Sequence, residues 1–241
     1  MNPILRSRAF RVGLGSTAGL ALAFTAVMGF AHTKPGRPLL HWMGIHSKSA
    51  AGACPLGYDK AQTVEQKEEG RRRFAKTHDG ATKAALRPAL GFDLDSTTRG
   101  DVLAWAAARG VRCVTPKTGP DLDCSDVSDA LLPAPFRGAD ARSLWLTFGE
   151  GDKLISVVAV RREKTAEPIS QAFTAVTSAI ESQAGKATTT AGDGSSATLS
   201  SGLLRQASAE YRFHDYYALA RATNMGDGFV LTEEYRSLPG G

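Results

Sequence analysis

The feature that most constrains this 241-residue chain is an uncharged run near its start. Residues 12–31 carry no charged side chain, whereas residues 1–11 contain three arginines, Arg6, Arg8 and Arg11, and no acid. A basic stretch before an apolar run is typical of an export signal, and a run of this length can also span a bilayer as a helix. We expect either a signal peptide cleaved after Ala31 or a retained membrane anchor. A third reading, a buried helix of a soluble protein, has no other support in the sequence.

Both main readings place the rest of the chain on the far side of a membrane. The arginines favour an N-terminus inside the cell, so the residues after Ala31 are exported. We therefore expect a globular part in the periplasm or outside the cell of a bacterial-type envelope. It is either anchored in the membrane through residues 12–31 or secreted after cleavage.

The formal net charge of +5 is unevenly distributed along the chain. Residues 32–90 hold 11 Lys+Arg against 5 Asp+Glu, whereas residues 91–241 hold 15 against 19. The positive excess therefore lies in the leader and the following segment, where it suits the charged surface of a membrane. It does not indicate nucleic acid as a partner, because the part with the composition of a folded domain is acidic.

Residues 32–90 have the composition of a basic stalk. Pro35 and Pro38 disfavour helix in the residues before them. A charged helix is predicted over 61–76, where two glutamates precede arginines at i,i+4 spacing. Its apolar stripe is thin, so we expect this helix to be solvated or loosely docked.

Residues 91–241 have the pattern of an α+β domain. In the first half we expect a short strand over 89–94, and then a helix with Ser96, Thr97 or Thr98 as its N-cap and Gly110 at its end. Strands over 111–115 and 122–127 should follow, and then a hairpin of 143–148 with 153–162. In the second half we expect a helix from Pro168 to Gly185, a flexible loop over 188–196, and an antiparallel meander of strands over 207–213, 216–224 and 229–236.

A helix followed by three or four strands thus occurs twice. We predict two units, about 91–165 and 166–241, each with a helix on one face of an antiparallel sheet. The pattern leaves open whether the two units share one continuous sheet.

Two of the three cysteines lie on the predicted strands that flank the turn at 115–121. If the turn is centred between residues 118 and 119, Cys113 lies directly opposite Cys124. A directly opposed antiparallel pair can form a disulfide, and an exported protein meets an oxidising compartment. The alternative is two buried free thiols. Cys54 is left over as a free thiol, an intermolecular disulfide or a small buried side chain.

Three stretches carry a resemblance to a known family. They are TTRGDVLAWAAARGVRC (97–113), DLDC (121–124) and SLWLTFGEGDKLISV (143–157): a capped helix followed by a cysteine, a second cysteine, and a hairpin around Gly-Asp. Residues 91–162 resemble the β-lactamase inhibitory protein family, whose fold is shared with small outer-membrane-assembly lipoproteins. The resemblance implies tandem helix-on-sheet modules that bind other proteins, and it does not imply β-lactamase inhibition.

No familiar catalytic or nucleotide-binding motif occurs, whether Walker A, GxGxxG, HExxH, CxxC or GxSxG. The only histidine after residue 91, His214, is predicted in a turn between strands. An aspartate cluster at 121–129 could bind calcium, but it lacks the spacing of an EF-hand loop, and a solvated acidic loop is the other reading. We lean towards a non-catalytic protein without a cofactor.

The stalk contains a second group of residues with metal-ligand chemistry. Imidazole and thiolate groups bind transition metals, and four such side chains fall close together in the sequence: His32, His41, His46 and Cys54. The segment is interrupted by prolines and glycines, so an interfacial role is the alternative. In that case Trp42 would lie against a membrane or a partner.

Three hypotheses of function remain. The first is a membrane-tethered module that binds another cell-envelope protein through the sheet face away from the helices. Its candidate contact residues are exposed aromatics: Trp42, Tyr211, Tyr216, Tyr217 and Tyr235. The second is an accessory subunit of a large membrane complex, held by its N-terminal helix. The third is a metal- or thiol-dependent protein that uses the stalk histidines and Cys54.

Overall fold

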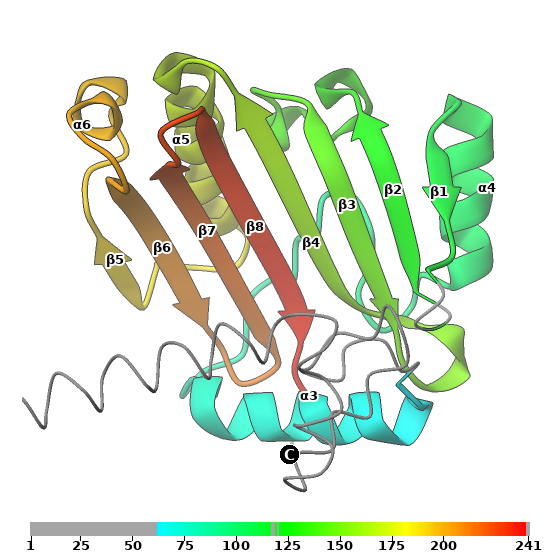
Figure 1. The fold of residues 1–241 in the computed structure, drawn as a ribbon. Coiled ribbons are helices and arrows are strands. Elements are labelled where there is room, and N and C mark those ends of the chain that lie inside the picture. Colours follow the sequence, from blue (N-terminus) through cyan, green and yellow to red (C-terminus); the bar gives the residue numbers. More distant parts are fainter. Residues whose placement is uncertain (1–61, 117–118, 120, 240–241) are drawn as a thin grey trace, which may run out of the picture. The chain divides into compact units, whose positions relative to one another are not determined.

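The computed structural model describes residues 62–116, 119 and 121–239, which form an α+β fold with one eight-stranded sheet (Figure 1). The strands are β1 (Arg112–Val114), β2 (Leu122–Val127), β3 (Ala141–Phe148), β4 (Leu154–Glu163), β5 (Thr189–Ala191), β6 (Gln206–Arg212), β7 (Tyr216–Asn224) and β8 (Phe229–Ser237). The helices are α3 (Val64–His78), α4 (Arg99–Arg109), α5 (Ala166–Gln183) and α6 (Ser196–Ser200). Three short 3₁₀ turns are η2 (Asp129–Leu131), η3 (Ala134–Phe136) and η4 (Glu150–Asp152). The predicted fold class is confirmed for these residues.

The sheet is antiparallel throughout and its strands lie in the order β1-β2-β3-β4-β8-β7-β6-β5. The first unit runs α4-β1-β2-β3-β4 and the second runs α5-β5-β6-β7-β8, with α6 inserted after β5. The last strands of the two units, β4 and β8, pair in the middle of the sheet. This answers the question that the sequence left open, because the two units share one continuous sheet.

The capping signals of α4 act as predicted. Thr98 is the N-cap and accepts a hydrogen bond from the Asp101 backbone, while the Asp101 carboxylate accepts one from the Thr98 backbone. Gly110 ends the helix in the left-handed region with φ 68°, which a residue with a Cβ adopts at a cost. The helix packs beside β1 and its Trp105 meets Phe92 edge to face.

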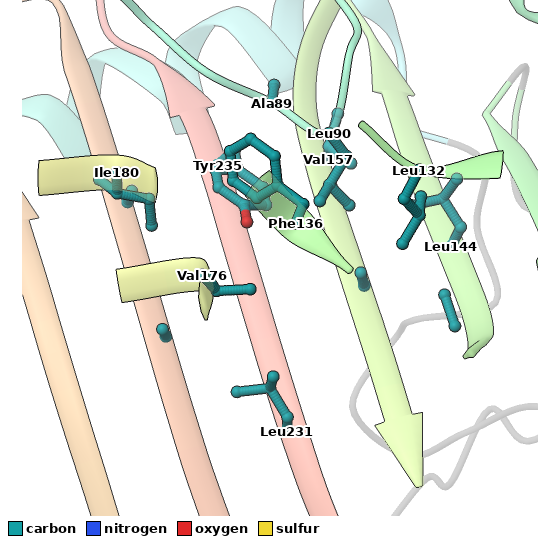
Figure 2. Close-up of a cluster of buried hydrophobic side chains, with 14 of the residues drawn as sticks. Ala89, Leu90, Leu132, Phe136, Leu144, Val157, Val176, Ile180, Leu231 and Tyr235 are labelled. Atoms are coloured by element: carbon teal, nitrogen blue, oxygen red, sulfur yellow. The ribbon is translucent and has the colours of Figure 1, made fainter. Parts of the chain in front are cut away.

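The main core lies between α5 and one face of the sheet. Apolar residues of α5 recur at helical spacing and face the sheet, and Ile169, Ala172, Val176 and Ile180 are fully inaccessible. The helix packs most closely on β7, whose side chains on this face are small: Ala218, Ala220 and Ala222. Figure 2 shows Val176 and Ile180 of α5 beside Tyr235, Leu231 and Phe136, which lies in η3. We call this covered side of the sheet the core face.

Two segments differ from their predictions. Residues 89–94 form a turn rather than a strand, because Leu90 adopts φ 57° and the apolar side chains of this segment fill the core instead of extending the sheet. Residues 188–196, expected to be a flexible loop, contain β5 and the start of α6. The threonines of β5 pair with residues of β6, and their β-branched side chains suit a strand even inside a glycine-rich stretch.

The charged helix of the predicted stalk is part of the folded unit. The compact unit that contains the sheet, Asp59–Gly241, also includes α3. The helix spans Val64–His78 rather than 61–76, and it lies across the ends of the strands (Figure 1). The boundary predicted at residue 90 is therefore too late, because hydrophobic periodicity does not detect the polar contacts that hold α3.

The predicted leader at 12–31, the beginning of the stalk and Cys54 lie outside the described residues. Within the described part of the chain, no helix combines the length and the apolar character needed to cross a bilayer.

Candidate binding site on the open face of the sheet

The sheet has a second face that α5 does not cover, and Trp145 of β3 projects from it. Its neighbours in the sheet are Asp123 on β2 and Val158 on β4. Leu144 and Leu146, on either side of it in sequence, point to the core face and are fully buried. The Trp145 side chain itself is 46% exposed. We call this side the open face.

A groove separates α3 from the open face, with a volume of about 480 Å³. Its lining combines polar, apolar and cationic side chains from α3, β3, β4 and the end of β8: Gln62, Gln66, Lys67, Arg71, Arg73, Phe74, Trp145, Thr147, Ile155, Ser156, Val158, Arg236, Ser237 and Leu238. Volumes of several hundred Å³ are typical of ligand pockets. The exposed Trp145 thus belongs to a hollow with a mixed lining rather than to a flat surface.

Lys67 fixes the first half of α3 to the β2–β3 end of the sheet. Its ammonium group lies 2.5 Å from Asp121 and donates to the Phe148 carbonyl at 3.3 Å. Only 3% of the Lys67 side chain is exposed, so its charge would be costly without these acceptors. The helix that the sequence predicted to be solvated or loosely docked is therefore held by an almost fully buried lysine.

Arg71 fixes the middle of α3 to the end of β8. Its guanidinium donates to Asp95 at 2.7 Å and to both the carbonyl and the hydroxyl of Ser237. Arg87 donates to the other oxygen of Asp95 at 2.7 Å. The Ser237 hydroxyl donates to Asp95 and accepts from Arg71 and Arg87, so the four side chains form one connected network.

The Asp95 carboxylate is stabilised in its charged form by this cluster. Partial burial raises its pKa, but the Ser237 hydrogen bond and the charges of Arg71 and Arg87 outweigh burial. The pKa of Asp95 therefore lies below its ordinary value of 3.8. The cluster is therefore a structural clamp in which the Asp95 carboxylate keeps its negative charge at mildly acidic and higher pH.

Aromatic contacts hold the last turns of α3. Phe74 stacks on His78 with ring centroids 3.9 Å apart, and both rings meet Tyr217 of β7 edge to face. The Arg236 guanidinium lies over the Phe74 ring, 4.5 Å from its centroid. Tyr217 lies on the open face, but α3 covers it and leaves only 4% exposed.

The groove is close to electrically neutral despite its four cationic side chains. Lys67, Arg71, Arg73 and Arg236 are each paired with a carboxylate of Asp121, Asp95, Glu69 and Glu234 respectively. The groove therefore offers apolar contact at Trp145 and its neighbours and hydrogen-bonding groups, rather than a net charge.

The predicted contact aromatics of the domain are buried, which corrects their expected exposure. Tyr211, Tyr216 and Tyr235 lie on the core face and are fully inaccessible. Tyr211 donates to the Thr177 carbonyl of α5, and Tyr216 donates to the Pro88 carbonyl. Burial raises the pKa of each of these hydroxyls. The remaining predicted aromatic, Trp42, lies outside the described residues.

The sequence analysis did not single out Trp145 as an exposed aromatic side chain, although the signal was present. Leu144, Leu146 and Phe148 alternate onto one face, so the residue between the two leucines had to point the other way.

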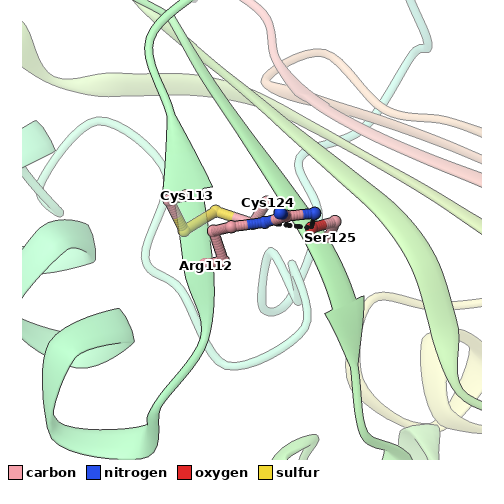
Figure 3. The surroundings of a disulfide bond; sticks show 4 residues. All are labelled: Arg112, Cys113, Cys124 and Ser125. Carbon is pink, nitrogen blue, oxygen red and sulfur yellow. Dashed lines mark hydrogen bonds between the residues drawn. A yellow bond between two sulfur atoms is a disulfide. The ribbon is translucent and has the colours of Figure 1, made fainter.

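Figure 3 shows a prediction that is confirmed, the Cys113–Cys124 disulfide, which bridges directly opposed residues of β1 and β2.

The other predicted sites receive no support from the described residues. In residues 62–116, 119 and 121–239 no group of three or more His, Cys, Asp or Glu side chains is arranged to hold a metal ion. Asp121 of the acidic cluster is paired with Lys67, and Asp129 accepts from the Gly138 backbone. The metal-ligand candidates His32, His41, His46 and Cys54 lie outside the described residues.

His214 lies in the turn between β6 and β7, as predicted. Its ring nitrogen Nδ1 is 3.0 Å from Asp79, and its backbone donates to the Thr82 carbonyl. These contacts fasten the segment after α3 to the sheet, which is a structural role.

Comparison of the chain with models of known protein families, with curated proteins and with solved structures gave no match.

Proposed function

We propose that this chain is an exported, membrane-tethered and non-catalytic module that binds another protein of the cell envelope through the open face of its sheet. The observation that carries the proposal is Trp145, a large aromatic side chain held 46% exposed on a central strand beside the groove. Tryptophan is among the residues that contribute most to protein interfaces, and a strand presents it at little entropic cost.

The surroundings of Trp145 support an interface of apolar contacts with polar edges. Val158 lies next to it in the sheet, and the hydroxyls of Thr147 and Ser156 line the same groove. Because the cations of the groove are paired internally, the partner should offer an apolar side chain for Trp145 and hydrogen-bonding groups at the rim.

The tether rests on the sequence. Three arginines followed by the uncharged residues 12–31 favour export and a membrane anchor, and the basic residues that follow suit a position near an anionic membrane surface. The resemblance to the β-lactamase inhibitory protein family supports the binding role, because that family consists of tandem modules that bind proteins.

The test is site-specific photocrosslinking of the full chain in the cells that produce it. A photoreactive phenylalanine at position 145 should form one recurrent adduct with an envelope protein. The same group at Leu103, an exposed hydrophobic position on α4, is the matched control and should not form that adduct. With the adduct identified, Trp145→Ala should weaken its binding about 30-fold or more, whereas Leu103→Ala should leave it unchanged. Identical adducts at both positions, or none at 145, would contradict the proposal.

A further inference from the structure

Three of the most exposed large hydrophobic side chains gather at the end of the strands opposite α3. Leu203 and Leu204, which precede β6, are 68% and 64% exposed, and Met225, in the turn between β7 and β8, is 50% exposed. The two loops touch, because a Cβ on Gly226 would lie 2.8 Å from the Leu203 Cδ1. We call Leu203, Leu204 and Met225 the Leu-Met tip.

The tip is held in place by a buried amide. Asn224 is 9% exposed, and its side-chain nitrogen donates to the carbonyls of Leu199 and Gly202 at 3.0 Å each. Its side-chain oxygen accepts from the Gly226 backbone at 2.8 Å. The Leu204 backbone donates to the Asn224 carbonyl, and the Asn224 backbone donates to the Arg205 carbonyl, which joins the loops further. A loop network that satisfies its buried polar groups in this way fixes where the exposed leucines point.

Leu204 occupies a backbone conformation that leucine rarely adopts. Its φ is 57°, in the left-handed region that glycine and asparagine enter far more readily. A residue chosen for stability at this position would be glycine. The chain therefore presents a leucine at a position where leucine is unfavourable for both the backbone and the exposed side chain.

The charge beside the tip is positive. Arg205 follows Leu204 directly and is exposed, and it takes part in none of the ion pairs found among the described residues. Asp227, in the β7–β8 turn, is paired with Arg162 at 2.5 Å. The aliphatic tip is thus accompanied by one uncompensated guanidinium on a long apolar stem.

We infer that the Leu-Met tip inserts into the headgroup boundary of an anionic lipid bilayer. Aliphatic side chains next to a basic residue suit this environment, because the arginine stem can lie along the acyl chains while its charge meets lipid phosphate. A protein partner is less consistent with the tip, since leucine is under-represented at interface hot spots, which favour aromatic side chains. The inference rests on the proposed function only in taking a membrane to be within reach of the tethered domain.

The experiment uses the full chain reconstituted into vesicles of phosphatidylcholine and phosphatidylglycerol with brominated acyl chains. In a Cys54→Ser background, a fluorophore is attached either at Ser200→Cys beside the tip or at Arg72→Cys on α3, both exposed positions. Bromolipid should quench the fluorophore at 200 and not at 72. Quenching at 200 should fall to the level of position 72 in the double variant Leu203→Ser/Leu204→Ser. It should weaken in Arg205→Gln, or when phosphatidylglycerol is left out.

A second variant separates loss of contact from loss of folding. Leu204→Gly relieves the left-handed leucine, so its melting temperature should rise by about 2–4 °C while quenching at 200 decreases. Absence of quenching at 200, equal quenching at 200 and 72, or quenching that survives Leu203→Ser/Leu204→Ser would overturn the inference. A protein crosslink at the tip without bromolipid quenching would also overturn it. The photocrosslink at Trp145 is scored independently, so failure of the lipid contact leaves the proposed protein contact open to its own test.

Discussion

Arg161 of β4 and Glu233 of β8 form an ion pair with a 2.5 Å separation, and neither side chain has any exposed surface. The pair lies where the two units join, because β4 and β8 are the last strands of each unit. Tyr235 donates to the second Glu233 oxygen at 2.6 Å, and Arg161 also donates to the Ala139 carbonyl. The joint between the units therefore depends on charge as well as on apolar packing.

Removing one member of this pair should be far more costly than removing both. Glu233→Gln leaves the Arg161 charge buried without a counterion and should lower the free energy of unfolding by about 3–5 kcal/mol. The double variant Arg161→Met/Glu233→Gln removes both charges and should cost less than Glu233→Gln alone, and Arg161→Met completes the mutant cycle. Urea denaturation of the four proteins of the mutant cycle gives the coupling energy, and additive effects would show that the pair is energetically unimportant.

The disulfide between Cys113 and Cys124 should stabilise the first unit. The bridge closes a short loop, with a sequence separation of 11, so its removal in Cys113→Ala/Cys124→Ala should lower the free energy of unfolding by about 2–3 kcal/mol. Alkylation followed by mass spectrometry checks the bond directly. The denatured, unreduced chain should take up two fewer labels from these positions than the reduced chain, and equal labelling would show that the thiols are free.

The Asp95 clamp should make stability fall in acid. Because the folded pKa of Asp95 lies below its ordinary value of 3.8, the carboxylate stabilises the fold above about pH 4. That contribution is lost as the pH falls through the folded pKa. Asp95→Asn should cost about 1–2 kcal/mol near neutral pH, and the difference from the parent chain should shrink below pH 4.

Asp152→Asn is the matched control for this titration. Asp152 also has a left-handed backbone, φ 59° against 65° for Asp95, so asparagine suits both positions equally. It is exposed and belongs to no ion pair found among the described residues. Thermal unfolding across pH 2–7 should separate the two variants, and parallel curves would argue against the clamp.

The docking of α3 should depend on Lys67. Lys67→Met keeps the apolar stem but leaves Asp121 without its counterion, so amide hydrogen exchange should accelerate over Val64–His78 while the sheet stays protected. Arg73→Ala is the control, since Arg73 is 70% exposed and its pairing distance is 3.6 Å. If both variants exchange like the parent chain, the buried lysine does not hold the helix.

The sequence predicted those parts of the fold where local chemistry decides the structure. Thr98, Asp101 and Gly110 bound α4 because caps satisfy backbone groups locally, and the opposed cysteines follow from the turn between their strands. Periodicity also placed the β3–β4 hairpin and the meander of β6, β7 and β8. It could not show that the two units share a sheet, since the β4–β8 pairing joins strands far apart in the sequence.

The candidate site was harder to predict, because alternation defines two faces without saying which is buried. Tyr211 and Tyr235 share a face with alanines, and the close approach of α5 to those alanines buries the tyrosines too. Tyr217 points the other way, yet α3 covers it. That cover rests on Lys67 and Arg71, whose burial no hydrophobic pattern reveals.

The two outermost strands, β1 and β5, have three residues each, whereas the central strands β4, β7 and β8 have nine or ten. A short edge offers an approaching strand few free backbone donors and acceptors. The sheet edges of two copies therefore form few hydrogen bonds with each other, which disfavours the growth of fibres by edge-to-edge pairing. Long strands in the middle and short ones at the rim give a sheet that stays wide enough to present a surface while it resists self-polymerisation.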